Sequence, residues 1–281
     1  IGVARALGRR RPERGRVAVL FQPAEETGEG AARMVADPVV KELAPDYTLA
    51  THNLPSKPLG ALVVRDGTFA CASTGLIVRL RGYTSHAAEP ENGASPVFAA
   101  STLAMALQAI PQRYVALHEL CKVTIVGVEV GGPHFGVTPG DGRVMATLRA
   151  ETDELLDQVL EICSRYARGT AAANGLEVEL ETIERFPATI NHPAVVDATV
   201  AAAEEHGIEV VREAHPFSWS EDFGHFTALA PGALIGLGAG LEQPALHHPD
   251  YDFPDALIEP SVRLFLSAAE RLASTDPVRR Q

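Results

Sequence analysis

Two adjacent carboxylates, Glu25 and Glu26, stand where a predicted strand gives way to a predicted helix. Residues 17–21 (VAVLF) form the short apolar run that is typical of a strand covered on both faces, and Pro23 ends it. Neighbouring side chains in an extended turn point in different directions. One carboxylate could therefore hold a metal ion while the other faces the metal-bound water. Both could equally complement the positive N-terminal end of a helix that we expect from about Gly30.

Histidines occur beyond two other predicted strands. His52 ends a strand predicted at residues 47–53, and His247 and His248 follow one predicted at residues 233–237. In open α/β sheets, ligands bind at the carboxyl ends of the strands. Neutral imidazole and carboxylate are both normal ligands of Zn²⁺ and similar divalent ions. Two adjacent histidines cannot easily face one metal, so at most one of the pair is a ligand, and a lone histidine at a strand end is more often structural.

Three further residues have chemistry that suits a site. His86 follows a predicted strand in GYTSHAAEP, where it is either a group at a domain edge or a plain surface histidine. Arg149 ends a strand, where it could clamp a carboxylate in bidentate fashion or be one more solvated charge. Asp222, in SWSEDFGHF, could support a metal ligand from behind or cap the helix that follows.

The elements that must position these residues fall into two groups. The middle of the chain predicts β-α-β-β-α-β, at residues 75–81, 95–110, 121–130, 143–150, 151–174 and 176–183. This order matches the split βαβ, ferredoxin-like unit. The flanking segments are typical of a parallel α/β layer. We therefore infer an α/β domain formed by residues 1–72 and 185–281, with a second domain inserted at residues 73–184.

Composition excludes several classes of partner. The chain has 281 residues and a net charge of −12, which argues against nucleic acid or an anionic membrane surface. No apolar run approaches the ~20 residues of a membrane span. The cysteines, Cys71, Cys121 and Cys163, have no CxxC spacing, and we interpret them as reduced thiols of a cytoplasmic protein.

Six motifs in order carry a resemblance to a known family. They are FQPAEE (21–26), THNLP (51–55), GYTSHAAEP (82–90), TLR (147–149), SEDF (220–223) and ALHHPDYDF (245–253). Together they resemble the M20 metallopeptidases, most of all the amidohydrolase branch with hippurate and indole-acetyl-amino-acid hydrolases. The resemblance implies a metallo-exopeptidase-like α/β/α catalytic domain with an inserted ferredoxin-like α+β lid and dimerisation domain.

The resemblance also implies a metal site. Glu25 matches the general base that deprotonates a metal-bound water. Glu26, His52 and His247 match ligands of a dinuclear centre, and two divalent ions drawn from Zn, Mn, Co or Ni are expected in the full-length protein. Family members carry a Cys-Gly-His-Asp-x-His segment upstream of the paired glutamates. We therefore expect this chain to be an N-terminally truncated fragment.

Two residues of the insert acquire roles through the same resemblance. His86 matches a lid histidine that reaches the active site of the partner subunit in family dimers and steadies the developing oxyanion. Arg149 matches an arginine that holds the free carboxylate of the substrate. The implied function is metal-dependent hydrolysis of the amide bond of N-acyl amino acids or related small amides, in a homodimer. A dipeptidase or aminopeptidase on the same scaffold, or a non-catalytic homologue, is the alternative.

Overall fold

The computed structural model describes residues 1–275, and the chain divides into two compact units. Unit 1 comprises residues 1–70 and the described residues from 189 onward, and unit 2 comprises residues 71–188. No helix in the described part of the chain is long and apolar enough to cross a membrane.

Unit 1 is built on a four-stranded sheet with the order β1-β12-β2-β11. Its strands are β1 (Thr48–Pro55), β12 (Gly232–Gly240), β2 (Leu62–Val64) and β11 (Val210–Arg212). β1 is parallel to β12 and β2 is parallel to β11, but β12 and β2 are antiparallel. The prediction of a parallel layer was therefore wrong in part. Only residues 56–61 separate β1 from β2, whereas a parallel return needs a crossover of a dozen or more residues.

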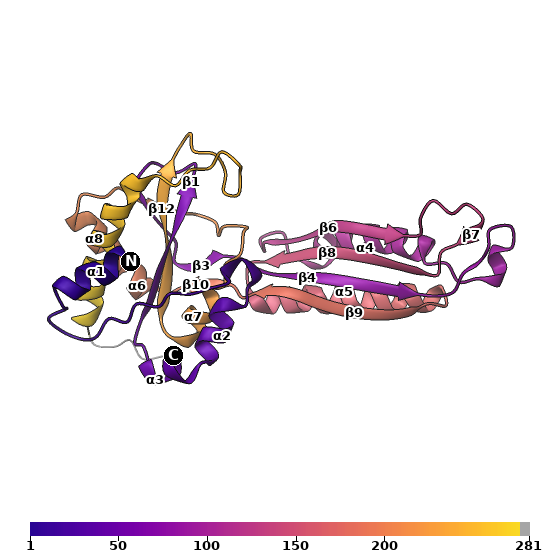
Figure 1. The fold of residues 1–281 in the computed structure, drawn as a ribbon, viewed down its shortest axis with the longest axis horizontal. Helices are drawn as coiled ribbons and strands as arrows, with labels where there is room; N and C mark the ends of the chain where they lie inside the picture. Colours follow the sequence, from indigo (N-terminus) through magenta and orange to yellow (C-terminus); the bar gives the residue numbers. More distant parts are fainter. Residues whose placement is uncertain (276–281) are drawn as a thin grey trace. The chain divides into compact units, whose positions relative to one another are not determined.

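Helices cover both faces of this sheet. Figure 1 shows α6 (Pro193–Glu205) and α8 (Ile258–Ala273) on one side of β1 and β12, with α2 (Gly30–Ala36) and α7 (Gly224–Leu229) on the other. Each side has its own buried apolar cluster. The remaining elements of unit 1 are α1 (Gly2–Arg9), η1 (Glu25–Thr27), α3 (Pro38–Leu43), β3 (Gly67–Ala70), β10 (Thr189–Asn191) and η3 (Asp255–Leu257).

The strand predicted at residues 17–21 is absent, and this prediction was wrong. Residues 16–24 form no strand, and Val19, Leu20 and Phe21 are 36%, 40% and 67% exposed. A strand needs a neighbour for its backbone groups, and no described strand pairs with this segment. Side-chain hydrogen bonds hold the segment at both ends instead: Arg16 donates to the carbonyl of Leu43 at 2.8 Å, and Gln22 donates to Asp222 at 2.6 Å.

Unit 2 has one four-stranded antiparallel sheet with the order β6-β8-β4-β9. Its elements are β4 (Ala72–Arg81), β5 (Ser85–His86), η2 (Pro90–Asn92), α4 (Val97–Tyr114), β6 (Cys121–Val130), β7 (Val137–Thr138), β8 (Asp141–Ala150), α5 (Asp153–Ala173) and β9 (Glu177–Phe186). The fourth strand thus lies beside the first, and the third separates the first from the second. This is the order of the split βαβ unit that the sequence predicted.

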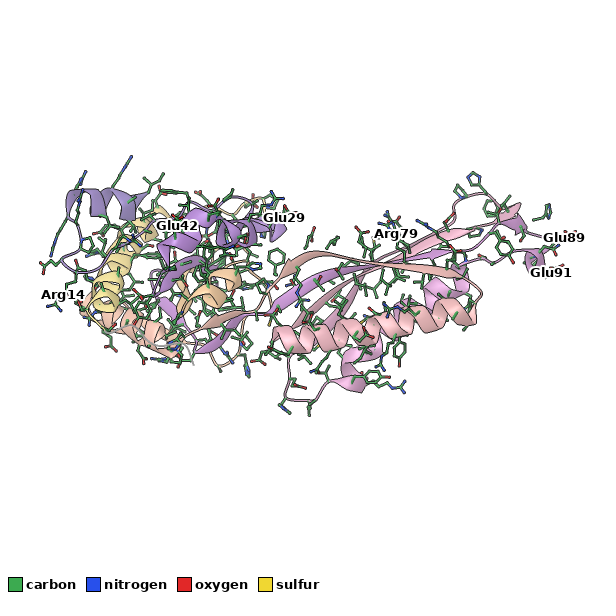
Figure 2. All side chains as sticks on the ribbon, turned by 90° about the horizontal axis from the view of Figure 1, so that it is seen from below. Arg14, Glu29, Glu42, Arg79, Glu89 and Glu91 are labelled. Atoms are coloured by element: carbon green, nitrogen blue, oxygen red, sulfur yellow. The ribbon has the colours of Figure 1, made fainter. Side chains whose placement is uncertain are left out.

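The sheet of unit 2 is covered on one face. α4 and α5 pack on it through a single apolar cluster whose strand residues alternate, as in Leu76, Val78 and Leu80 of β4. Figure 2 shows Arg79 on the opposite face, away from α5. There its guanidinium pairs with Glu181 of β9 at 2.6 Å.

Candidate metal centre

The turn that carries the paired glutamates is a tight structure in unit 1. Ala24 adopts a left-handed conformation (φ 53°, ψ 42°), and η1 begins at Glu25 directly after it. The N–H of Gly30 donates to the carbonyl of Ala24 at 3.2 Å, which closes the loop. A Cβ on residue 30 would lie 1.7 Å from the carbonyl oxygen of Pro23, so only glycine fits there. A non-glycine residue in the left-handed region is a strained feature that often accompanies functional sites.

Asp222 holds this turn in place through hydrogen bonds to both of its ends. It is fully buried, and its carboxylate accepts two hydrogen bonds from the Gln22 amide, at 2.6 and 2.7 Å. It also accepts one from the N–H of Ala31, at 2.9 Å, in the first turn of α2. It is not the N-cap residue of α7: Phe223 occupies that position, and its N–H donates to Oε2 of Glu221 at 3.4 Å. The hydrogen bonds of Asp222 go to Gln22 and Ala31 and not to α7, so the capping alternative does not hold, and support of a metal ligand stays a prediction.

Three carboxylates gather at this point. Oxygens of Glu25, Glu221 and Asp222 all lie within 4.8 Å of one another. Burial raises the pKa of Glu25 to about 7, and the nearby charges of Glu26 and Asp222 add to the effect. Burial also raises the pKa of Glu221 to about 7, with the charge of Glu25 as the second cause. Like charges held this close favour a cation between them, so the donors present fit a divalent metal ion.

His52 lies on the same site, although not where the sequence placed it. β1 continues to Pro55, so His52 is inside the strand and the prediction that it ends the strand was wrong. Its Nδ1 lies 2.8 Å from the carbonyl oxygen of Asn53, and its Nε2 lies 4.0 Å from Oε1 of Glu221. Burial lowers the pKa of His52, and the charges of Glu26 and His247 also act on it. A neutral imidazole with one nitrogen held by a carbonyl is the form that binds metals.

The loop after β12 brings in His247. This residue is in the left-handed conformation (φ 64°), and its charge acts on both Glu25 and His52. The neighbouring His248 turns to its own loop, where its Nδ1 accepts a hydrogen bond from the N–H of Asp250 at 3.1 Å. Of the pair, His247 therefore acts electrostatically on Glu25 and His52, while its role as a metal ligand stays a prediction.

Two of the expected site residues belong to unit 2. His86 is exposed in the short pair β5–β7, and its Nδ1 accepts a hydrogen bond from the N–H of Ala88 at 3.1 Å. Arg149 is half-buried in β8, opposite Ser73 of β4. Glu25, Glu26, His52, Asp222 and His247 thus belong to unit 1, whereas His86 and Arg149 belong to unit 2.

A model of peptidase family M20/M25/M40 matches residues 1–271. The chain belongs to this family. It is 28% identical to an N-acetylcysteine deacetylase of Bacillus subtilis over 271 residues, covering 96% of this chain and 70% of the relative. It is 30% identical to a hippurate hydrolase of Campylobacter jejuni, covering 87% of this chain and 64% of the relative.

Solved structures agree with the M20 assignment. A dinuclear metal-binding peptidase of the M20 family from Bacillus subtilis superposes with a TM-score of 0.81 at 25% identity, covering 98% of this chain and 70% of that chain. An aminobenzoyl-glutamate utilization protein from Klebsiella pneumoniae gives 0.76 at 25% identity, covering 96% of this chain and 65% of that one. The chain therefore spans about two thirds of the length of the proteins it matches.

Sequence reasoning missed two residues of this site. Glu221 stands beside Asp222 in SEDF, and the adjacent pair was the signal that could have drawn attention to it. Trp219 lies two residues earlier and contacts the His52 ring, with centroids 5.1 Å apart. No spacing in the sequence predicts that contact, because the two residues are 167 positions apart.

Proposed function

We propose that this M20 protein hydrolyses the amide bond of N-acyl amino acids with the help of divalent metal ions. The observation that carries the proposal is the cluster of Glu25, Glu221 and His52, three groups from distant segments that converge in unit 1. The names of its relatives support the substrate class, since they include N-acetylcysteine and N-acetyldiaminopimelate deacetylases and a hippurate hydrolase.

The chain's own residues would hold the metal. We assign Glu26, His52 and His247 as ligands, and the structure adds Glu221 as a further candidate. The ions belong to the Zn, Mn, Co and Ni group, because mixed imidazole and carboxylate donors suit all four. When bound, they would supply Lewis-acid polarisation of the amide carbonyl and acidify a water.

Proton transfer falls to Glu25. A general base is most effective when its pKa lies near the working pH, and burial raises the pKa of this carboxyl to about 7. We assign Glu25 the removal of a proton from water and its delivery to the leaving amine. Asp222 keeps the turn in place through Gln22 and Ala31 and touches no reacting atom in this scheme.

Unit 2 supplies the remaining roles in the proposal. The guanidinium of Arg149 would bind the free carboxylate of the substrate, and the exposed ring of His86 would stabilise the oxyanion in a partner subunit. This scheme makes residues 1–72 and 185–281 the catalytic part and residues 73–184 a lid through which a homodimer forms. The chain's net charge of −12 and its three cysteines, which have no CxxC spacing, fit a cytoplasmic enzyme.

The test is hydrolysis of N-acetyl and N-benzoyl amino acids by protein loaded with each of the four metals. Glu25→Gln removes the base and is expected to lower kcat by at least about 100-fold. Glu242→Gln, an exposed glutamate in unit 1, is the matched control and is expected to retain activity. Activity that requires a free α-amine would replace the proposal with an aminopeptidase. Inactivity with every metal, or full activity of Glu25→Gln, would refute it.

A further inference from the structure

The only tryptophan of the chain, Trp219, lies against the imidazole of His52. Their ring centroids are 5.1 Å apart and the planes are inclined by 30°. Phe217 stacks on the same indole at 5.0 Å and 23°, and Phe69 meets it edge-on at 6.0 Å and 77°. Among the described residues no ring contact joins Phe217 to His52, so each of the two rings contacts the indole independently.

Two of the rings that contact the indole, Phe217 and Phe69, are anchored to the core of unit 1. The N–H of Phe217 donates to the carbonyl of Phe69 at 2.8 Å, and Phe217 also forms an isolated bridge with Ala70. Phe69 is fully buried in the core of unit 1. The ammonium of Lys57, which pairs with Glu213, lies 5.9 Å from the centre of the Phe217 ring. Trp219 therefore packs against two rings, Phe69 and Phe217, that are themselves fixed in the core of unit 1.

His52 needs such support. The hydrogen bond between Nδ1 and the carbonyl of Asn53, at 2.8 Å, fixes the position of one ring atom. It does not fix the plane of the imidazole, which can still rotate about this contact unless neighbouring side chains restrain it. A metal ligand works only when its free nitrogen points at the ion, and groups that orient a ligating imidazole change metal affinity by about 10–100-fold. Trp219 is the aromatic ring that covers the imidazole.

We propose that Trp219 is a positioning residue that sets the plane of the His52 ring, so that Nε2 faces Glu221 and a divalent cation can be shared between them. The inference rests on the proposed metal site and deepens it. Trp219 is not assigned to substrate stacking, because Phe217 and His52 already contact the indole. Nor does it touch the reacting atoms in this scheme.

The first test measures the affinity of the metal-free chain for Mn²⁺ and Zn²⁺ by calorimetry. Trp219→Ala is expected to weaken binding about 10–100-fold. Trp219→Phe, which retains a ring, is expected to stay near the wild type. Leu264→Ala is the control: this residue is fully buried on α8, on the other face of the sheet, so the variant loses stability without losing metal affinity. Equal affinity of wild type and Trp219→Ala would overturn the inference while leaving the proposed metal site intact.

The second test needs no metal. In the metal-free chain, the ring protons of His52 are expected to show an upfield ring-current shift in ¹H–¹³C spectra, assigned with His52→Gln. Trp219→Ala is expected to abolish that shift and broaden the signals, whereas Leu264→Ala is expected to preserve them. Unchanged His52 signals in Trp219→Ala would overturn the inference whatever the metal measurements give. A wild type that binds neither ion would refute the proposed function and, with it, the shared cation.

Discussion

The metal-free protein is expected to lose stability as the pH rises through the range in which its clustered glutamates ionise. Burial and the charge of Glu25 raise the pKa of Glu221 from 4.5 to about 7. A group whose pKa is raised on folding contributes its stability fully below the unfolded pKa, here 4.5, and loses it as the pH rises through the folded pKa, here about 7. The loss arises because the unfolded chain releases the proton more readily than the folded one.

The magnitude follows from the shift. The Glu221 side chain is 13% exposed, so solvent screens it little, and a shift of this size corresponds to about 3 kcal/mol. Glu25 is present in both proteins, and its own raised pKa is caused by burial and by the charges of Glu26 and Asp222, so it does not enter the difference as a second contribution. Replacing Glu221 by Gln removes the ionisable group. The free energy of unfolding of the wild type, relative to Glu221→Gln, is therefore expected to fall by about 3 kcal/mol between pH 4.5 and 8.

The assay is urea denaturation in the presence of a chelator, followed by tryptophan fluorescence. Trp219 is the sole tryptophan and lies in unit 1, so the signal reports the unit that contains the site. His52 acts in the opposite direction, because burial lowers its pKa and its contribution is lost as the pH falls. His52 is present in both proteins, so comparing the wild type with Glu221→Gln removes most of the pH dependence that His52 contributes. A difference that stays flat from pH 4.5 to 8, or that grows with pH, would refute the reasoning.

Three other outcomes are expected. Gly30→Ala places a Cβ 1.7 Å from the Pro23 carbonyl oxygen, so this variant is expected to lose about 3 kcal/mol of stability and to bind metal more weakly. The control is Gly169→Ala, at a position on α5 where a Cβ meets open space. In denaturation curves the control is expected to be more stable than the wild type by about 0.5–1 kcal/mol. Asp222→Ala leaves the buried Ala31 N–H without its acceptor and is expected to lower the free energy of unfolding by about 3 kcal/mol. If the loss is no greater than that of Asp250→Ala, a variant at an exposed aspartate, Asp222 does not hold the turn. Divalent metal at about 100 times its Kd is expected to stabilise the chain by about 2.7 kcal/mol in thermal melts, and no shift with any of the four ions would argue against the metal site.

The sequence determined most of the local structure. Alternating apolar residues in the strands and the apolar stripes of the helices predicted the β-α-β-β-α-β order of unit 2, and the structure confirmed it with the strand order β6-β8-β4-β9. The alternation of apolar and polar residues was enough to predict the strands of unit 2, because each of these strands has one solvated face and one buried face. The motif order was also enough to indicate the M20 family, which the family comparison confirmed.

The same reasoning failed where a segment depends on distant partners. Residues 17–21 have the composition of a buried strand, yet residues 18–21 are exposed. Strand formation requires hydrogen-bonded neighbours, which composition does not report. The antiparallel contact of β12 with β2 was missed for a related reason: the direction of a strand depends on the path of the whole chain.

The chemistry divides in the same way. Residue types and motif order were enough to select Glu25, Glu26, His52 and His247 as candidates, because carboxylates and imidazoles are the groups that bind divalent ions. Only the tertiary structure brought Glu221 to 4.0 Å from His52 and set Trp219 against the same ring. Side-chain type is a local property that a sequence states directly, whereas the distance between two side chains depends on how every intervening element packs.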